Sequence, residues 1–172
     1  MHNGGEQSRP RVLAPHHIGI HVSSIDAALP FFVDVLGLEI SFRWKPRAPY
    51  LETLLAAADY DMEAVVLRVP GSSFAVELVK FGHVTAPPAA ASEAAAGTAH
   101  LALAVVDIDD MCRRITEAGF ELLSKPVRPT IGPICGGKVV LAVGPDGVRI
   151  ELIESPNSLH GAEDSESGSF AP

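Results

Sequence analysis

The chain contains one pattern twice, and this internal repeat limits its possible folds more than any single motif does. HIGIHVSSID (His17–Asp26) aligns without a gap on HLALAVVDID (His100–Asp109), with identical His, Val, Ile and Asp residues. Further along, FAVELV (Phe74–Val79) matches VRIELI (Val148–Ile153), and LGLEI matches AGFEL between them. Two copies of one supersecondary unit are the simplest explanation of such self-similarity.

Each copy is predicted to follow the order β-α-β-β-β. The copy begins with an apolar run that is too short for a helix and is therefore expected to be a strand. Alternating or continuous apolar runs predict three more strands after the helix. The expected strands are 17–22, 38–44, 63–69 and 73–81 in the first copy, and 100–106, 121–123, 138–143 and 148–154 in the second.

The helix of each copy has recognisable start and stop signals. Ser24 and Asp107 are good N-cap residues, and Gly37 and Gly119 stand where a left-handed residue commonly ends a helix. Pro30 lies inside the first helix, where it removes a hydrogen bond. We therefore expect that helix to start late or to bend.

These patterns predict an α+β protein with two tandem βαβββ modules, residues 15–82 and 98–154. The first module has an extra short helix near 49–60, which the second lacks. Three segments without such patterns are predicted to be unstructured: a polar N-terminal tail (1–14), an Ala/Pro-rich linker (83–97) and an acidic C-terminal tail (155–172).

The composition excludes several classes of protein. No stretch approaches the roughly 18 apolar residues of a membrane span, and the first residues lack the apolar region of a signal peptide. We therefore expect a cytoplasmic protein without a membrane partner. A formal net charge of −8 and the lack of a basic stripe argue against nucleic acid as a partner. The two cysteines, Cys112 and Cys135, are too few for a disulfide framework.

Four polar residues occupy matching positions in the two copies. Strand alternation places His17 and His100 on a face of the first strand that otherwise carries mostly small residues, which predicts an adjacent pocket. The last strand of each copy carries an acid, Glu77 or Glu151, between apolar neighbours. A buried carboxylate needs a cation or a hydrogen-bond donor.

Pseudo-twofold packing of the modules can bring these two imidazoles and two carboxylates to one point. Such a set suits one divalent metal ion, Zn, Ni, Co, Mn or Fe, and leaves two octahedral positions for substrate oxygens. Any one of the four residues alone would more often be an ordinary hydrogen-bonded residue. Their occurrence at matching repeat positions favours the metal site.

Several segments of the sequence resemble the vicinal-oxygen-chelate superfamily, which includes glyoxalase I, methylmalonyl-CoA epimerase, extradiol dioxygenases and bleomycin-resistance proteins. The resemblance covers about residues 15–154 and is carried by HHIGIHV, DVLGLEI, FAVELVKF, TAHLALAV and GPDGVRIELIE. Each motif is weak by itself, but their order and spacing are specific. The resemblance implies a curved mixed sheet around a metal-binding cavity.

The resemblance also implies the site and its chemistry. The family's metal positions fall on His17, Glu77, His100 and Glu151, whereas His16 has the opposite strand parity. The implied activity is that of an isomerase, epimerase or lyase that moves a proton next to a carbonyl through a metal-bound enediolate. Glu151 would serve as base as well as ligand, with Glu77 as the symmetric candidate. A small-molecule substrate and a homodimer are expected.

Two other functions stay open at this point. An extradiol-type ring-cleaving dioxygenase would need only two histidines and Glu151, if Glu77 points away. A metal-free, antibiotic-sequestering protein would keep the fold without the ligands. For the substrate pocket, the candidates are His21, where bacterial glyoxalase I typically has an Arg, and Arg149, which shares a strand face with Glu151. Arg149 would pair with a substrate anion or with a neighbouring carboxylate.

Overall fold

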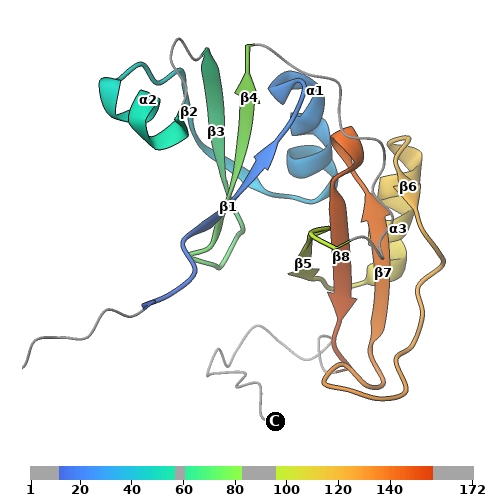
Figure 1. Cartoon of the computed structure of the whole chain (residues 1–172). Helices are drawn as coiled ribbons and strands as arrows, with labels where there is room; N and C mark the ends of the chain where they lie inside the picture. The colour runs from blue at the N-terminus through green and yellow to red at the C-terminus, as the bar shows by residue number, and fades with distance from the viewer. Residues whose placement is uncertain (1–11, 57–60, 83–95, 157–172) are drawn as a thin grey trace, which may run out of the picture.

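The computed structural model describes residues 12–56, 61–82 and 96–156. The described chain forms two βαβββ modules, each with its own four-stranded mixed sheet (Figure 1). This confirms the α+β, two-module prediction. The tails and the linker predicted to be unstructured lie almost entirely outside the described residues.

In the first module, the strand order is β1-β4-β3-β2. Strand β1 pairs parallel with β4, and the other neighbours are antiparallel. A parallel pair requires a crossover, which the helical segment after β1 provides. The elements are β1 (His17–His21), α1 (Ile25–Leu29), η1 (Pro30–Val35), β2 (Glu39–Trp44), α2 (Pro49–Leu55), β3 (Met62–Arg68) and β4 (Ala75–Phe81).

The second module repeats this topology with the order β5-β8-β7-β6. It has no counterpart of α2, as the sequence predicted. Its elements are β5 (His100–Ala104), α3 (Ile108–Glu117), β6 (Glu121–Leu122), β7 (Lys138–Val143), η2 (Pro145–Gly147) and β8 (Arg149–Glu154). Among the described helices of both modules, none is long and apolar enough to cross a lipid bilayer.

The first helix changes its geometry at Pro30. The Ser24 hydroxyl accepts a hydrogen bond from the Ala27 amide and caps α1, as predicted. From Pro30 the chain continues as the π-helical segment η1, in which the Leu36 amide donates to the Phe31 carbonyl at 3.0 Å. Because proline has no amide hydrogen, the regular ladder cannot continue through it.

Phe31 of η1 joins the two modules into one hydrophobic core. Its side chain is fully buried, and its ring centroid lies 4.5 Å from that of Phe120 in the second module. A Cβ at Gly144 would approach the Phe31 ring to 2.7 Å, so only glycine fits at that position. The modules are also linked by the Ser23 amide, which donates to the Asp146 carboxylate at 2.7 Å.

Replacing Phe31 with alanine is expected to lower the free energy of unfolding by about 3–5 kcal/mol, because it leaves a cavity where the modules meet. Urea or guanidinium unfolding followed by circular dichroism measures this change. Leu54→Ala, at a side chain that is 71% exposed on α2, serves as the control and should change stability by less than about 0.5 kcal/mol. Similar stabilities for the two variants would contradict the shared core.

Candidate metal-binding site

The first strand of each module exposes the face that carries its histidine. In β1, His17, Gly19 and His21 are on the exposed face, whereas Ile20 is buried and Ile18 is half-buried. In β5 the same alternation exposes the face of His100 and turns the opposite face to the core. The strand parity expected from the sequence therefore holds in both modules.

Glu77 of β4 faces His17 of β1. The two strands are parallel neighbours, and Glu77 pairs in register with Gly19, two residues beyond His17. The His17 Nε2 atom lies 3.5 Å from the Glu77 Oε2 atom, and the Glu77 side chain is only 19% exposed. The imidazole and the half-buried carboxylate are therefore neighbours on one face of this sheet.

The second module repeats this arrangement. Glu151 of β8 pairs in register with Ala102, two residues beyond His100 on β5. The His100 Nε2 atom lies 3.2 Å from the Glu151 Oε2 atom, with Glu151 25% exposed. The internal repeat thus extends from the backbone to one matching imidazole–carboxylate pair in each module.

The spacing of both pairs fits two neighbouring ligands of one metal ion. Imidazole nitrogens and carboxylate oxygens bind divalent transition metals at about 2.0–2.2 Å, so two such atoms at a right angle lie about 3.0 Å apart. The observed separations of 3.5 and 3.2 Å need only small adjustments to reach this value. Each pair can therefore supply one nitrogen and one oxygen to a shared cation.

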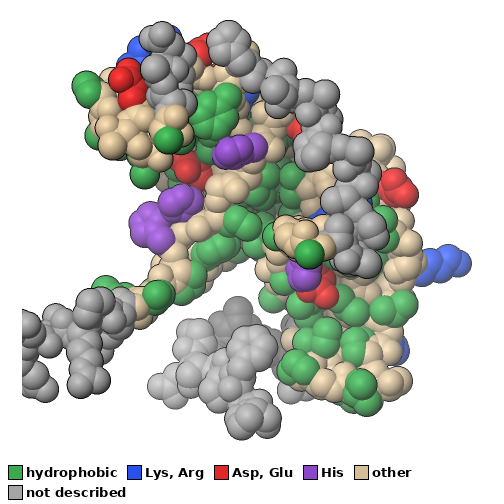
Figure 2. Space-filling model, in the orientation of Figure 1, with side chains coloured by type: hydrophobic (Ala, Val, Ile, Leu, Met, Phe, Trp, Pro, Cys, Tyr) green, Lys and Arg blue, Asp and Glu red, His purple; other side chains and the backbone are tan. Residues whose placement is uncertain are grey.

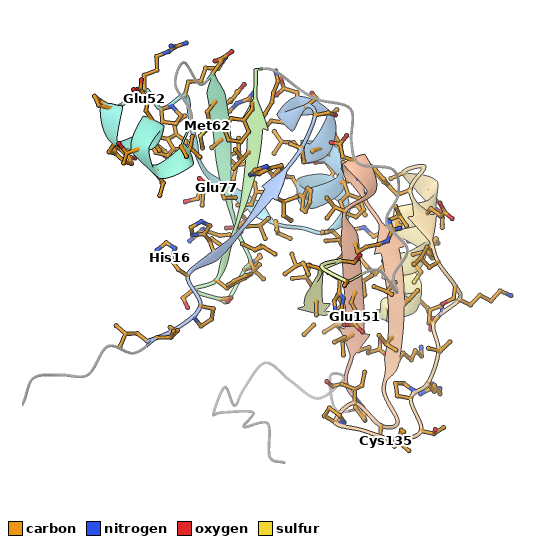
Figure 3. All side chains as sticks on the ribbon, in the orientation of Figure 1. His16, Glu52, Met62, Glu77, Cys135 and Glu151 are labelled. Carbon is orange, nitrogen blue, oxygen red and sulfur yellow. The ribbon has the colours of Figure 1, made fainter. Side chains whose placement is uncertain are left out.

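The single chain does not bring the two pairs together. Glu77 and Glu151 lie on different sheets, well apart from each other (Figure 3). In the space-filling view, the histidine side chains form separate patches on the visible face (Figure 2). Within the described residues, no group of three or more His, Cys, Asp or Glu side chains is placed to hold a metal.

His16 contacts the ring of His17, although its strand parity placed it outside the predicted site. Its Nδ1 atom lies 2.8 Å from His17 Nδ1, so one ring donates a hydrogen bond to the other. This bond leaves His17 Nε2 directed at Glu77. Histidine ligands of metals commonly have their second ring nitrogen held by such a partner. The adjacent pair of histidines in the sequence was the available signal.

His21 and Arg149, the two candidates for the substrate pocket, lie at the junction of the modules. The His21 ring packs edge-on against Phe81, with centroids 5.3 Å apart. The Arg149 guanidinium donates to the Gly147 carbonyl at 2.9 Å. Both residues line one pocket between β1 and β5, beside His100.

A network of charged side chains in the first module lies around Arg43. This guanidinium hydrogen-bonds Asp26 and Glu63, and these bonds lower the pKa of both carboxyl groups. The nearby Lys45 also contacts Glu63 at 3.6 Å. Arg43 and Lys45 are thus paired with carboxylates of the same chain, and these ion pairs explain the cluster without a bound ligand.

Known proteins resemble this chain over most of its length. Residues 16–139 match the sequence profile of the Glyoxalase/Bleomycin resistance protein/Dioxygenase superfamily. A 2-epi-5-epi-valiolone epimerase from Actinomyces sp. is 29% identical over 160 residues, which cover 86% of this chain and 82% of the epimerase. A probable lactoylglutathione lyase from Synechocystis sp. is 30% identical over 143 residues, which cover 81% and 93% of the two chains.

A solved structure shows the same fold. A glyoxalase family protein from Bacillus cereus superimposes with a TM-score of 0.72 at 24% identity, over 86% of this chain and 97% of that protein. The profile match includes three of the four matching polar residues, His17, Glu77 and His100. This chain therefore belongs to the Glyoxalase/Bleomycin resistance protein/Dioxygenase superfamily.

Proposed function

We propose that this protein is a divalent-metal-dependent enzyme that moves a proton next to a carbonyl group, as an isomerase, epimerase or lyase. The observation that carries the proposal is the pair of matching His–Glu contacts, one in each module, each spaced like two neighbouring metal ligands. The relatives named as an epimerase and as lactoylglutathione lyases support this class of enzyme.

The ligands in this proposal are His17, Glu77, His100 and Glu151, and the ion is one of Zn, Ni, Co, Mn or Fe. When bound, a divalent cation would supply a Lewis acid that polarises the carbonyl and acidifies the neighbouring C–H bond. His16 would keep the His17 ring in a fixed orientation through the bond between their Nδ1 atoms.

Glu151 is the proposed base. Its carboxylate takes the proton from the carbon next to the carbonyl and returns it to the opposite face of that carbon or to its neighbour. The substrate is neither oxidised nor reduced by this transfer. Glu77 occupies the equivalent position in the first module and is the second candidate for the same step.

The position of Glu77 favours this reaction over ring cleavage. A dioxygenase-type triad would use His17, His100 and Glu151 and would leave Glu77 outside the site. Instead, the Glu77 Oε2 atom lies 3.5 Å from the His17 Nε2 atom. Four protein donors are thus available, which supports the isomerase or lyase class.

We infer that two chains share each metal site in a homodimer. The first pair of one chain would meet the second pair of its partner, and a twofold axis would create two identical sites. Exposed apolar side chains on the ligand-bearing faces support this arrangement. Phe42, which is 54% exposed, lies across strand β3 from Glu77 on the same face of the sheet. Leu123, which is 42% exposed, lies across strand β7 from Glu151 in the same way. A second copy would cover both.

Metal content measured by plasma mass spectrometry on untagged protein tests the proposal. We expect about one divalent ion per wild-type chain and little in His100→Ala/Glu151→Ala, because that variant loses half of the ligands. His21→Ala removes a non-ligand imidazole from the same face as His17 and should keep the metal. If wild-type protein stayed without metal after incubation with excess Ni, Co, Zn, Mn and Fe, the enzyme proposal would fail.

A further inference from the structure

Helix α2 lies at the side of the first sheet that is remote from the second module (Figure 1). Within the described residues, three buried apolar side chains lie outside the core that the modules share: Leu51, Ala64 and Val79. Ala64 and Val79 pair in register on the face of the sheet that carries Glu77, and Leu51 is the buried residue of α2. These three side chains, which we call the α2 core, place α2 over the part of this face beyond Glu77.

Few features hold α2 in place. Its seven residues are too few for a helix that is stable by itself. Tyr50 and Leu54 are 58% and 71% exposed, so Leu51 supplies most of the apolar burial. The helix has no side-chain N-cap and ends at Ala56, whose left-handed φ of 50° is unfavourable for a residue with a Cβ. Such a helix opens at a lower cost in free energy than the shared core does.

The indole of Trp44 has a buried N–H group next to the α2 core. Trp44 pairs in register with Ala64, so its side chain lies on the same face of the sheet as Glu77. The Nε1 atom exposes less than 1 Å² to solvent, and no described residue accepts a hydrogen bond from it. A buried donor without an acceptor destabilises the closed position of α2. Opening of α2, followed by contact with an acceptor oxygen, would remove this cost.

We propose that α2 is a cover that the substrate displaces, and that Trp44 Nε1 then donates a hydrogen bond to an oxygen of the substrate. A site built around such a donor rejects analogues that leave it unpaired. Trp44 is therefore a specificity-determining residue of the proposed enzyme. This inference rests on the proposed function, because it takes Glu77 as part of the metal site.

The sheet geometry indicates which oxygen accepts this bond. Trp44 lies two strands away from Glu77 and two residues further along, which is about 10 Å across the sheet and about 7 Å along it. The acceptor is thus a second oxygen, several bonds from the reacting carbonyl. Because the indole is a neutral donor and its neighbours Ala64 and Val79 are apolar, this oxygen belongs to an uncharged hydroxyl or carbonyl group.

Hydrogen exchange of the indole N–H, followed by NMR on full-length protein, tests the cover. Trp44 is the only tryptophan of the chain, so its indole signal is unambiguous. We expect this hydrogen to be protected less than the amides of Val65 and Val76 in the shared core, because α2 opens without global unfolding. Leu51→Ala should accelerate indole exchange about tenfold without changing the two core amides.

Leu54→Ala is the matched control, because it makes the same change at an exposed position of the same helix. It should leave indole exchange at the wild-type rate. Equal protection of the indole and the core amides in wild type, or equal acceleration of both by Leu51→Ala, would overturn the cover.

Hydroxamates test the donor on full-length protein loaded with zinc, because their two vicinal oxygens bind the metal. Each probe has a chain of three to six methylene groups that ends in a hydroxyl, and it is compared with the analogue that ends in a methyl. In calorimetry, wild type should bind the hydroxyl compound of one length about tenfold more tightly than its analogue. Trp44→Phe should remove this preference while both compounds still bind. Tyr50→Phe, which removes an exposed hydroxyl on α2, should behave like wild type.

Equal affinity of wild type for the hydroxyl and methyl compounds at every length would overturn Trp44 as the donor while leaving the metal site intact. If no hydroxamate bound, the proposed function would fail and the donor role of Trp44 with it. The exchange experiment needs no metal and would still decide whether α2 opens.

Discussion

Co-expression of two defective chains is expected to restore about one quarter of the wild-type metal content. One chain carries His17→Ala/Glu77→Ala and the other His100→Ala/Glu151→Ala, so neither alone can complete a site. In a twofold dimer whose sites are shared, each mixed dimer has one intact site and one site without ligands. Random pairing makes about half of the dimers mixed, which gives the expected quarter.

The expected recovery of metal content follows from the positions of the two His–Glu pairs in the chain. His17 meets Glu77 and His100 meets Glu151, but the two pairs lie on separate sheets. The control is each double variant expressed alone, which should bind almost no metal. Size-exclusion chromatography with light scattering confirms that the co-expressed sample is dimeric. A dimeric sample that bound no more metal than its controls would show that the site does not form across two chains.

Glu151→Gln is expected to lower turnover about 10²–10⁴-fold while leaving the fold nearly unchanged. The amide has the same shape as the carboxylate, but it cannot accept the proton from carbon. Glu151 is 25% exposed and its neighbours Ile150 and Leu152 still fill the core, so thermal unfolding should shift only slightly. Deuterium uptake from solvent next to the carbonyl, followed by NMR, measures the transfer.

Two compounds are used as probes in this assay, 2-epi-5-epi-valiolone and S-lactoylglutathione, because relatives of this chain are named for them. Glu121→Gln is the matched control, because Glu121 belongs to the same sheet and is not a proposed ligand. Metal content is measured on the same samples, so that lost turnover can be separated from lost metal. Normal turnover in Glu151→Gln, with a large loss in Glu77→Gln, would assign the base to Glu77 instead.

Much of the fold follows from local patterns that can be read along the chain. The repeat predicted two βαβββ modules, and each has the expected order of elements. Gly37 and Gly119 adopt positive φ at the helix ends, as their positions indicated. Pro30 was expected to disturb the first helix, and the π-helical segment begins there. These features depend on a few neighbouring residues, so the sequence specifies them directly.

A local rule also predicted which strand face carries His17 and which carries His100. A strand side chain has a fixed direction, and two parallel neighbours in register bring specified side chains together. The pairing of His17 with Glu77, and of His100 with Glu151, depends on the strand order within each sheet, which the sequence analysis did not predict. Whether all four residues meet at one point depends in addition on how the two modules are placed relative to each other.

That placement is decided by contacts between residues far apart in the chain. Phe31 packs against Phe120, and the Ser23 amide binds Asp146, so the modules are held with β1 and β5 on either side of a pocket. No periodicity in the sequence encodes these distances, because they result from how whole side chains fill a shared core. The separation of the two ligand pairs, and the pocket beside Arg149, therefore became visible only in three dimensions.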